Sequence, residues 1–376
     1  MATRRPRVVL FVAALLVIAG LTGAWRLRFS WNPTEWFPET EPVRVATELV
    51  DRELGGSSTI AVMLDTGVEN GLHDPALLAR LDELRVYAES LERGPISVGK
   101  TVSVADVLKE IHQALNENRP EYYTIPGDRR LVAQEFLLFE NAGSDDLEDV
   151  VDSRFAVANF TLRVPWTDAF ESAPFVDEIE AHFREVLGDE VRVTMTGKNV
   201  IGGRIFTAMI LSMTKSYALA LLIVTPLMVL LLGNLRGGLI AMIPNLIPII
   251  LTLGLMGWLG FPLDFATMMI GAVILGVAVD DTIHFMQNFQ RFYRGSGDPQ
   301  GAVRRTLETT GRAMLFTSIV LAAGFFIWAL ATMASVVNLG LFAGFAVIAA
   351  FLADVLVAPA LMVLFQRRVA ATSTAA

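Results

Sequence analysis

The stretch GAVILGVAVDDTIHF, residues 271–285, holds two adjacent carboxylates and a histidine in an otherwise apolar run. It belongs to the apolar run 265–285, whose length and composition are typical of a helix that crosses a lipid bilayer. One aspartate at the middle of such a helix costs about 2.5 to 3.5 kcal/mol on translocon-insertion scales. Asp280 and Asp281 together therefore require a polar or hydrated setting, and the stretch predicts a bundle of membrane helices around them.

The composition of the whole chain agrees with this. Of its 376 residues, 53% are apolar, and the mean hydropathy of +0.50 is too high for a soluble globular protein. A formal charge of -9 with no basic stripe argues against a nucleic-acid partner. The absence of cysteine excludes disulfides, cysteine metal sites and a thiol nucleophile.

Six apolar stretches are long enough to span a membrane, since about 20 residues are needed to cross about 30 Å of hydrocarbon. We place them at residues 8–25, 216–232, 239–259, 265–285, 313–333 and 336–365. The second is short as drawn and can extend backward through residues 205–213. Residues 204–366 then form a bundle of five spans, followed by a tail at 367–376.

Positive charges indicate the orientation, because short cytoplasmic loops carry an excess of Lys and Arg. The N-terminal arginines and those at the alternate loops fall on one side: Arg4, Arg5, Arg7, Arg236, Arg291, Arg294, Arg304, Arg305, Arg312, Arg367 and Arg368. We therefore predict cytoplasmic termini, with residues 26–203 exported. A cleaved signal peptide is the alternative for span 1–25, although its apolar run exceeds the usual signal core of about 7 to 15 residues.

The exported segment 26–203 has normal polar content and a readable periodicity. Strand patterns occur at 59–65, 96–102, 154–164 and 191–195, and helical patterns occur at 77–91 and 176–186. The order β, α, β, β, α, β predicts a ferredoxin-like α+β domain inserted between the first two spans. Residues 103–150 form an insertion with two helices, which either sets specificity or acts as a structural cap.

Asp280, Asp281 and His284 are the strongest candidates for chemistry. Burial and a neighbouring like charge both favour the neutral form of a carboxyl group, so the pair can bind and release a proton. His284 lies four residues after Asp280 and three after Asp281, on a shared helix face, and can pass that proton on. The alternative is that Asp281 and His284 simply lie near the cytoplasmic headgroups.

Other polar residues in the spans are less specific. Thr317 and Ser318 either hydrogen-bond the carboxylates or bond back to their own helix, and Asn245 either lines the interior or holds helices together. Asn338 and Asp354 are assigned to interface positions, and Gly276 to helix packing. No zincin, phosphate-loop or nucleophile-elbow motif occurs, so the sequence predicts neither an enzyme nor a bound cofactor or metal.

The chain resembles the resistance-nodulation-division (RND) superfamily, in its hydrophobe-exporter branch with the MMPL and Patched-like proteins. The resemblance covers nearly the whole chain and rests on three stretches: GVAVDDTIHF at 276–285, RGGLIAMIPNLIPII at 236–250 and TLETTGRAMLFTS at 306–318. It implies a transporter of the inner membrane, driven by a proton gradient through Asp280 and Asp281, that exports lipids or other hydrophobic compounds. Spans two to six would correspond to a sterol-sensing-like domain.

The chain departs from that family in one respect, because members commonly carry two such halves and this sequence resembles only the second. The resemblance thus implies a homodimer, a separate partner half, or a chain that is a truncated product of a longer one. Two alternatives remain. One is an accessory subunit like those of the Sec translocon, which share the six-span layout. The other is a non-transporting lipid sensor or scaffold.

Overall fold

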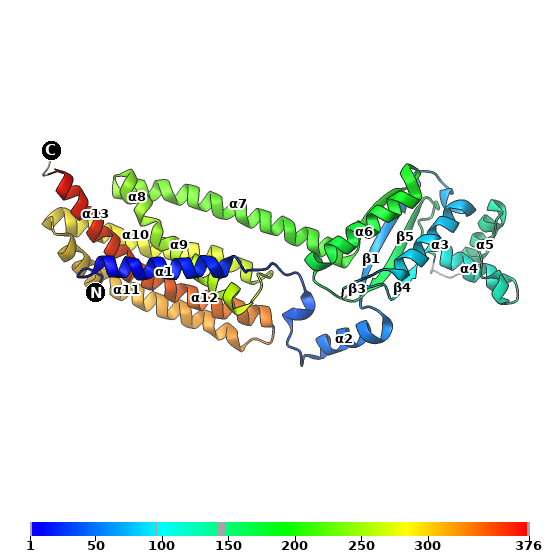
Figure 1. Ribbon diagram of the computed structural model, residues 1–376, viewed down its shortest axis with the longest axis horizontal. Coiled ribbons are helices and arrows are strands. Elements are labelled where there is room, and N and C mark those ends of the chain that lie inside the picture. Colours follow the sequence, from blue (N-terminus) through cyan, green and yellow to red (C-terminus); the bar gives the residue numbers. More distant parts are fainter. Residues whose placement is uncertain (1, 95, 142–146, 374–376) are drawn as a thin grey trace. The chain divides into compact units, whose positions relative to one another are not determined.

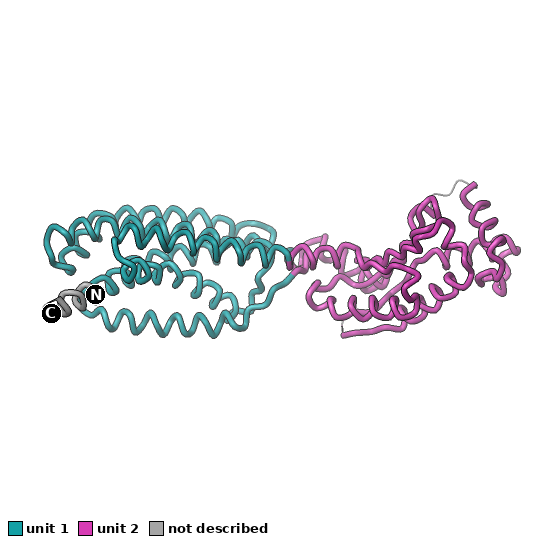
Figure 2. The backbone as a smooth tube through the Cα atoms, turned by 90° about the horizontal axis from the view of Figure 1, so that it is seen from above, with its two compact units in different colours: residues 1–30, 36–38, 208–376 teal, residues 31–35, 39–207 magenta. Residues whose placement is uncertain are grey.

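The computed structural model describes residues 2–94, 96–141 and 147–373, and it divides into two compact units (Figure 2). Unit 1 consists of residues 1–30, 36–38 and 208–376, and unit 2 consists of residues 31–35 and 39–207. Residues 95 and 142–146, which belong to a predicted turn and to the predicted insertion, lie outside the described residues, as do 374–376 of the predicted tail.

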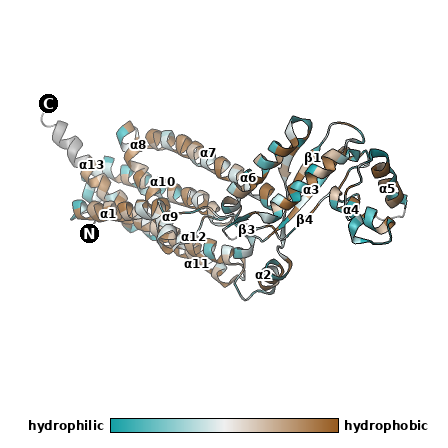
Figure 3. Cartoon of the chain, turned by 45° about the vertical axis from the view of Figure 1, so that its right-hand side comes forward, coloured by the Kyte–Doolittle hydropathy of each residue, from teal (hydrophilic) through white to brown (hydrophobic). Residues whose placement is uncertain are grey.

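Unit 1 is helical, and its elements are labelled in Figure 1. They are α1 (Pro6–Ala24), the later part of α7 (Lys198–Leu232), α8 (Leu235–Ala241), α9 (Ile243–Leu259), α10 (Ile270–Ser296), α11 (Pro299–Ile327), α12 (Ala334–Leu352) and α13 (Ala358–Ser373). Six helical stretches in the described chain are long and apolar enough to cross a membrane. The predicted spans are therefore confirmed by length and composition, and the brown ribbons of these helices in Figure 3 mark their hydrophobic residues.

Three spans differ in detail from the sequence prediction. Helix α7 runs for 35 residues and includes Pro226, because no Gly or Pro interrupts it between Gly203 and that proline. The third span is interrupted at Met242, between α8 and α9, where Pro244 lacks an amide donor and disfavours a helical residue before it. The sixth span contains a π-helical segment, Ala353–Val357, between α12 and α13.

Helix α1 crosses α9 at a contact made by glycines. A Cβ added at Gly23 or Gly257 would collide with backbone atoms of the other helix, and so would one at Gly254. Trp258 fixes the crossing, since its Nε1–H donates to the Ala19 carbonyl at 2.8 Å. Small residues let membrane helices approach this closely, so α1 is packed as a helix of the bundle.

Unit 2 contains a four-stranded antiparallel sheet in the order β4-β5-β1-β6. Along the chain its main elements are β1 (Ser58–Asp65), α3 (Pro75–Ser90), β4 (Lys100–Val102), β5 (Val157–Val164), α6 (Ala169–Leu187) and β6 (Arg192–Thr196). Val62 lies opposite Phe160 on β5 and Met195 on β6, and all three are buried. Alternate strand residues pack with the buried faces of α3 and α6 in one core, as their period-two pattern predicts.

The remaining elements of unit 2 are short or peripheral. Helix α2 (Pro42–Leu54) precedes β1, and helices α4 (Val104–Leu115) and α5 (Arg129–Asn141) lie between β4 and β5. The strand predicted at 96–102 is divided: β3 (Ile96–Ser97) pairs with β2 (Glu92–Arg93), while β4 pairs with β5. The division falls at Gly99, whose Cα approaches the Gly55 backbone too closely for any side chain.

Candidate functional site

The two aspartates of α10 have different surroundings. Successive helical residues are rotated by about 100°, so neighbours cannot share one face. Asp281 is only 8% exposed and points into the bundle, whereas the Asp280 side chain is 72% exposed in this chain. The structure thus separates the pair into an interior and an exterior carboxylate.

His284 accompanies the exterior carboxylate. Its Nε2 lies 3.7 Å from Asp280 Oδ1, one helical turn away, and its side chain is also exposed. Asp280, Asp281 and His284 all line a cleft of about 480 Å³ between α10 and α11. The three residues predicted to act together are therefore placed around one space, in which an imidazole and two carboxylates can exchange protons.

The predicted polar partners are distributed more widely. Thr317 lines the same cleft, but its hydroxyl donates to carbonyls of its own helix, Ala313 at 3.2 Å and Met314 at 3.0 Å. Ser318 is buried, and its Oγ has no hydrogen-bond partner among the described residues. Asn338 lies 16 residues before Asp354 on the sixth span, about 24 Å along a helix. It is therefore too distant to contact Asp354.

Gly276 makes no close packing contact with the rest of this chain. A Cβ built on Gly276 would meet no atom within 4 Å. The helix packing expected at this glycine is therefore not found between the helices of one chain, because this face of α10 is uncovered.

A buried polar cluster connects three spans behind Asp281. Thr282 Oγ1 lies 2.6 Å from Asp354 Oδ1 and 2.7 Å from Asn245 Oδ1. Asn245 and Thr282 are fully buried and Asp354 is 1% exposed. The interface position predicted for Asp354 is wrong, because its side chain is buried inside the bundle, eleven residues before the sixth span ends at Phe365. The sequence pattern singles out Asn245 and Asp354 separately but not Thr282, the residue whose hydroxyl joins them.

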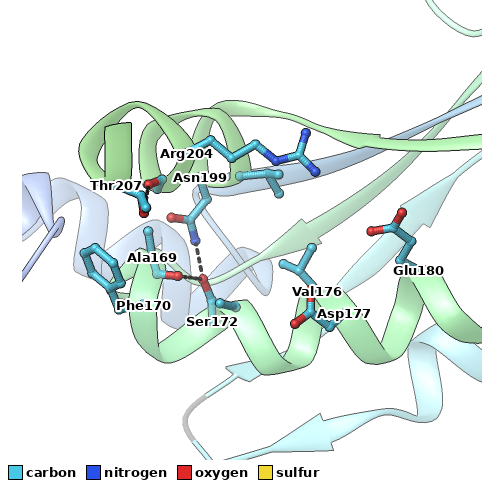
Figure 4. A pocket seen from close by; sticks show the side chains of 12 residues that line it. Ala169, Phe170, Ser172, Val176, Asp177, Glu180, Asn199, Arg204 and Thr207 are labelled. Carbon is cyan, nitrogen blue, oxygen red and sulfur yellow. Dashed lines mark hydrogen bonds between the residues drawn. The ribbon is translucent and has the colours of Figure 1, made fainter. Parts of the chain in front are cut away.

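Unit 2 contains a separate pocket between α6 and the first turns of α7 (Figure 4). Its volume is about 310 Å³, and its lining is mainly apolar, with Phe170 and Val176 among the lining residues. Asn199 Nδ2 donates to Ser172 Oγ at 3.2 Å, while the buried Asn199 Oδ1 has no partner among the described residues. Ligand pockets commonly have such a combination of apolar walls and few polar groups.

Comparison with known proteins identifies the family. A sequence model of the MMPL family matches residues 36–375, which include the acidic pair, the buried cluster and the pocket. The chain belongs to the MMPL family. MMPL proteins are membrane transporters rather than enzymes.

A second similarity is more limited. This MMPL chain is 32% identical over 128 residues to MJ1562 of Methanocaldococcus jannaschii, which is described as a membrane protein. The alignment covers 34% of this chain, and it spans about a third of the relative (33%).

The chemistry available to this MMPL chain is that of protons and hydrophobic ligands. Among the described residues, no group of three or more His, Cys, Asp or Glu is arranged to hold a metal ion. The cleft instead offers one interior carboxylate, one exterior carboxylate and one imidazole. These are groups that can carry a proton through a membrane bundle.

Proposed function

We propose that the chain is a half-size MMPL transporter, or the C-terminal half of one, that exports lipids or other hydrophobic compounds from the cell inner membrane, driven by the proton gradient. The observation that carries this proposal is Asp281, which is buried within an apolar span and makes no ion pair with any described residue. An intramembrane carboxylate without a cation is expensive to keep ionised, and such residues commonly serve proton relays.

The cleft supplies a route by which Asp281 can exchange its proton. His284 and Asp280 line the same cleft on its exposed side, and imidazole changes charge near neutral pH. A proton can move from water to His284 or Asp280, and then to Asp281. Export coupled to this movement needs no bound cofactor, since the gradient supplies the free energy.

Unit 2 supports the substrate side of the proposal. We infer that it is a ferredoxin-like domain on the exported side, since its sheet order matches that topology and both chain ends carry arginines typical of the cytoplasmic face. The walls of its pocket are mainly apolar, with Asp177, Glu180 and Arg204 also among the lining residues. The buried acceptor Asn199 Oδ1 has no partner among the described residues, which suits a lipid with a hydroxyl or amine group.

A second half is part of the proposed transporter. Ala272, Gly276, Asp280 and His284 follow one another at four-residue spacing on α10, and all are exposed in the single chain. A carboxylate facing lipid costs about 2.5 to 3.5 kcal/mol, whereas small residues at this spacing favour helix packing. We therefore expect another copy or a related half to cover this stripe of four residues, hereafter the α10 stripe.

The test is proton-dependent flux in reconstituted vesicles. With a fluorescent lipid as substrate, the native protein should show transport that disappears when the pH gradient is collapsed, and Asp281→Asn should abolish it. Glu308→Gln is the matched control, because Glu308 is an exposed carboxylate on α11 paired only with Arg304.

Two results would contradict the proposal. Gradient-driven flux unchanged in Asp281→Asn would remove the relay. Lipid binding that survives the loss of both Asp280 and Asp281, with no flux in the native protein, would favour a sensor or scaffold. Co-purification with translocon components would favour the accessory-subunit alternative.

A further inference from the structure

The buried cluster Asp354–Thr282–Asn245 lies behind the acidic pair and is not explained by it. Its three side chains come from three different spans, α9, α10 and the π-helical segment, and are buried almost completely. Asp354 Oδ2 has no hydrogen-bond partner among the described residues. Buried polar groups are normally satisfied, so an orphan carboxylate oxygen in a bundle core requires a physical reason.

We propose that Asp354 is a second proton-binding carboxyl group of the bundle, which holds its proton towards Thr282 and exchanges it in concert with Asp281. The proton-binding part of this inference stands on the geometry of the cluster. Its part in transport rests on the proposed function.

Counting hydrogens supports a proton on Asp354. The Thr282 hydroxyl has one hydrogen but lies within hydrogen-bond distance of two oxygens, Asn245 Oδ1 and Asp354 Oδ1. If Thr282 donates to Asn245, its contact with Asp354 needs a hydrogen on the carboxyl group. A protonated Asp354 then donates to Thr282 Oγ1, and the hydrogens of both the carboxyl group and the hydroxyl are used, while Asn245 Nδ2 faces Met242 Sδ at 3.8 Å.

The competing arrangement has the Asn245 amide turned over, so that its N–H donates to Thr282 and Thr282 donates to an ionised Asp354. This leaves a full negative charge in the bundle core with one hydrogen bond and one bare oxygen. Burying such an ionised carboxylate without a cation costs far more free energy than burying a neutral carboxyl group with one unpaired carbonyl oxygen. The neutral form is therefore favoured.

The surrounding helices carry their cations away from Asp354. Helices α9 and α12 contain no titratable residue, and α1 contains only Arg7, near its N-terminal end. Arg367 and Arg368 of α13 follow Asp354 by 13 and 14 residues, about 20 Å along a helix. On α10, His284 is exposed beside Asp280, and Arg291 and Arg294 follow Thr282 by nine and twelve residues. On α10, Asp281 is a second carboxyl group of the bundle interior, next in sequence to Thr282. Two such carboxyl groups bind protons as a coupled pair. When one of them binds a proton, the other holds its own proton less tightly.

The π-helical segment places Asp354 in this position. Residues Ala353–Val357 take the wider π turn between α12 and α13, and Asp354 is its second residue. Single π turns within α-helices commonly occur at functional sites, because the extra residue redirects side chains. Thr282 directly follows Asp281, so any movement of α10 that exposes Asp281 also moves the hydroxyl that holds the Asp354 proton.

Infrared spectroscopy tests the proton without requiring transport, because a protonated carboxyl absorbs at a C=O stretch distinct from that of a carboxylate. In lipid vesicles at neutral pH, Asp354→Asn should remove the band of one carboxyl group. Thr282→Val should keep that band but shift it, since the hydrogen bond is lost. Glu308→Gln should leave it unchanged. A spectrum identical in native protein and Asp354→Asn would overturn the inference.

Flux separates the role of Asp354 from the proposed function. If the native protein transports, Asp354→Asn should lose gradient-driven flux as Asp281→Asn does. Native-like flux in Asp354→Asn would make its proton structural and contradict the relay. If the native protein does not transport, the proposed function fails, while the infrared result still decides whether Asp354 is protonated. Flux driven by a sodium gradient would overturn the assignment of a proton.

Discussion

Lys109 of unit 2 shows how a buried charge is stabilised by specific partners. Its side chain is 4% exposed, and its Nζ lies 2.6 Å from Asp82 and 3.1 Å from Asp106. Arg85 adds a second cation, 2.8 Å from Asp82. Burial alone would raise the pKa of Asp82, but the hydrogen bonds from Lys109 and Arg85 outweigh burial and hold that pKa below its usual value. The pKa of Lys109 is raised by the same carboxylates, against the effect of burial.

This cluster predicts the pH dependence of unit 2. A carboxyl with a depressed pKa stabilises the fold above its unfolded pKa of about 3.9, and that stability is lost as the pH falls through the lower folded value. Lys109→Met should destabilise the protein by about 2 to 3 kcal/mol, less than for a fully buried pair because Asp82 is a third exposed. The substitution should also reduce the loss of stability of the fold as the pH falls. Thermal unfolding of the purified chain against pH measures both effects.

The control for this prediction is Lys100→Met, which removes an exposed lysine from β4. Its unfolding should match that of the native protein at every pH. Equal effects of the two substitutions would mean that net charge, and not the buried pairs, determines the stability.

The membrane site shows how far single residues could be predicted. The sequence located Asp280, Asp281 and His284, because ionisable residues are conspicuous in an apolar run. It could not decide which of two adjacent aspartates faces the interior, since that depends on how α10 is rotated against its neighbours. Asp354 was misplaced for a related reason. Hydropathy does not show where a span of 32 residues enters the bundle core.

At the scale of elements, the α1–α9 crossing depends on glycines. Gly23→Leu should separate the two helices, because a Cβ at this position already collides with Gly254 and Trp258. Overpacking of this kind destabilises a folded protein by about 1 to 3 kcal/mol. We expect a larger loss here, because the added side chain collides with backbone atoms. The loss of stability is measured by heating the protein in detergent and recording, by size-exclusion chromatography, how much of the monodisperse peak remains at each temperature.

Gly324→Leu is the matched control, since a Cβ at Gly324 on α11 meets no atom within 4 Å. It should melt like the native protein. If both leucine variants melt alike, close approach of α1 and α9 contributes nothing to the stability of the bundle.

Elements were predicted well where their periodicity was strong. Strands β1, β5 and β6 and helices α3 and α6 follow from alternating or helical apolar patterns, and the two helices of the insertion follow from theirs. The division between β3 and β4 did not follow, because it depends on the contact of Gly99 with Gly55, more than forty residues earlier in the chain. Short-range patterns do not contain such tertiary contacts.

At the scale of the whole molecule, the uncovered α10 stripe bears on assembly. Asp280 and His284 have no covering helix in this chain, and nothing packs against Gly276. In lipid, helices associate through small residues that permit close backbone contact, and polar residues add hydrogen bonds across the interface. A second copy related by two-fold symmetry would bring both stripes together, since a two-fold interface uses the same surface twice.

Single-cysteine cross-linking tests this directly, because the native chain contains no cysteine. Under mild oxidation in membranes, Ala272→Cys should form a disulfide-linked dimer, which requires the two Cα atoms to approach within about 7 Å. Phe316→Cys is the control. Phe316 lies on α11, is 69% exposed, and is not among the residues that line the cleft with Asp280 and His284. Monomer at Ala272→Cys, or equal dimer at both positions, would exclude a homodimer through α10 and direct the search to a separate partner half.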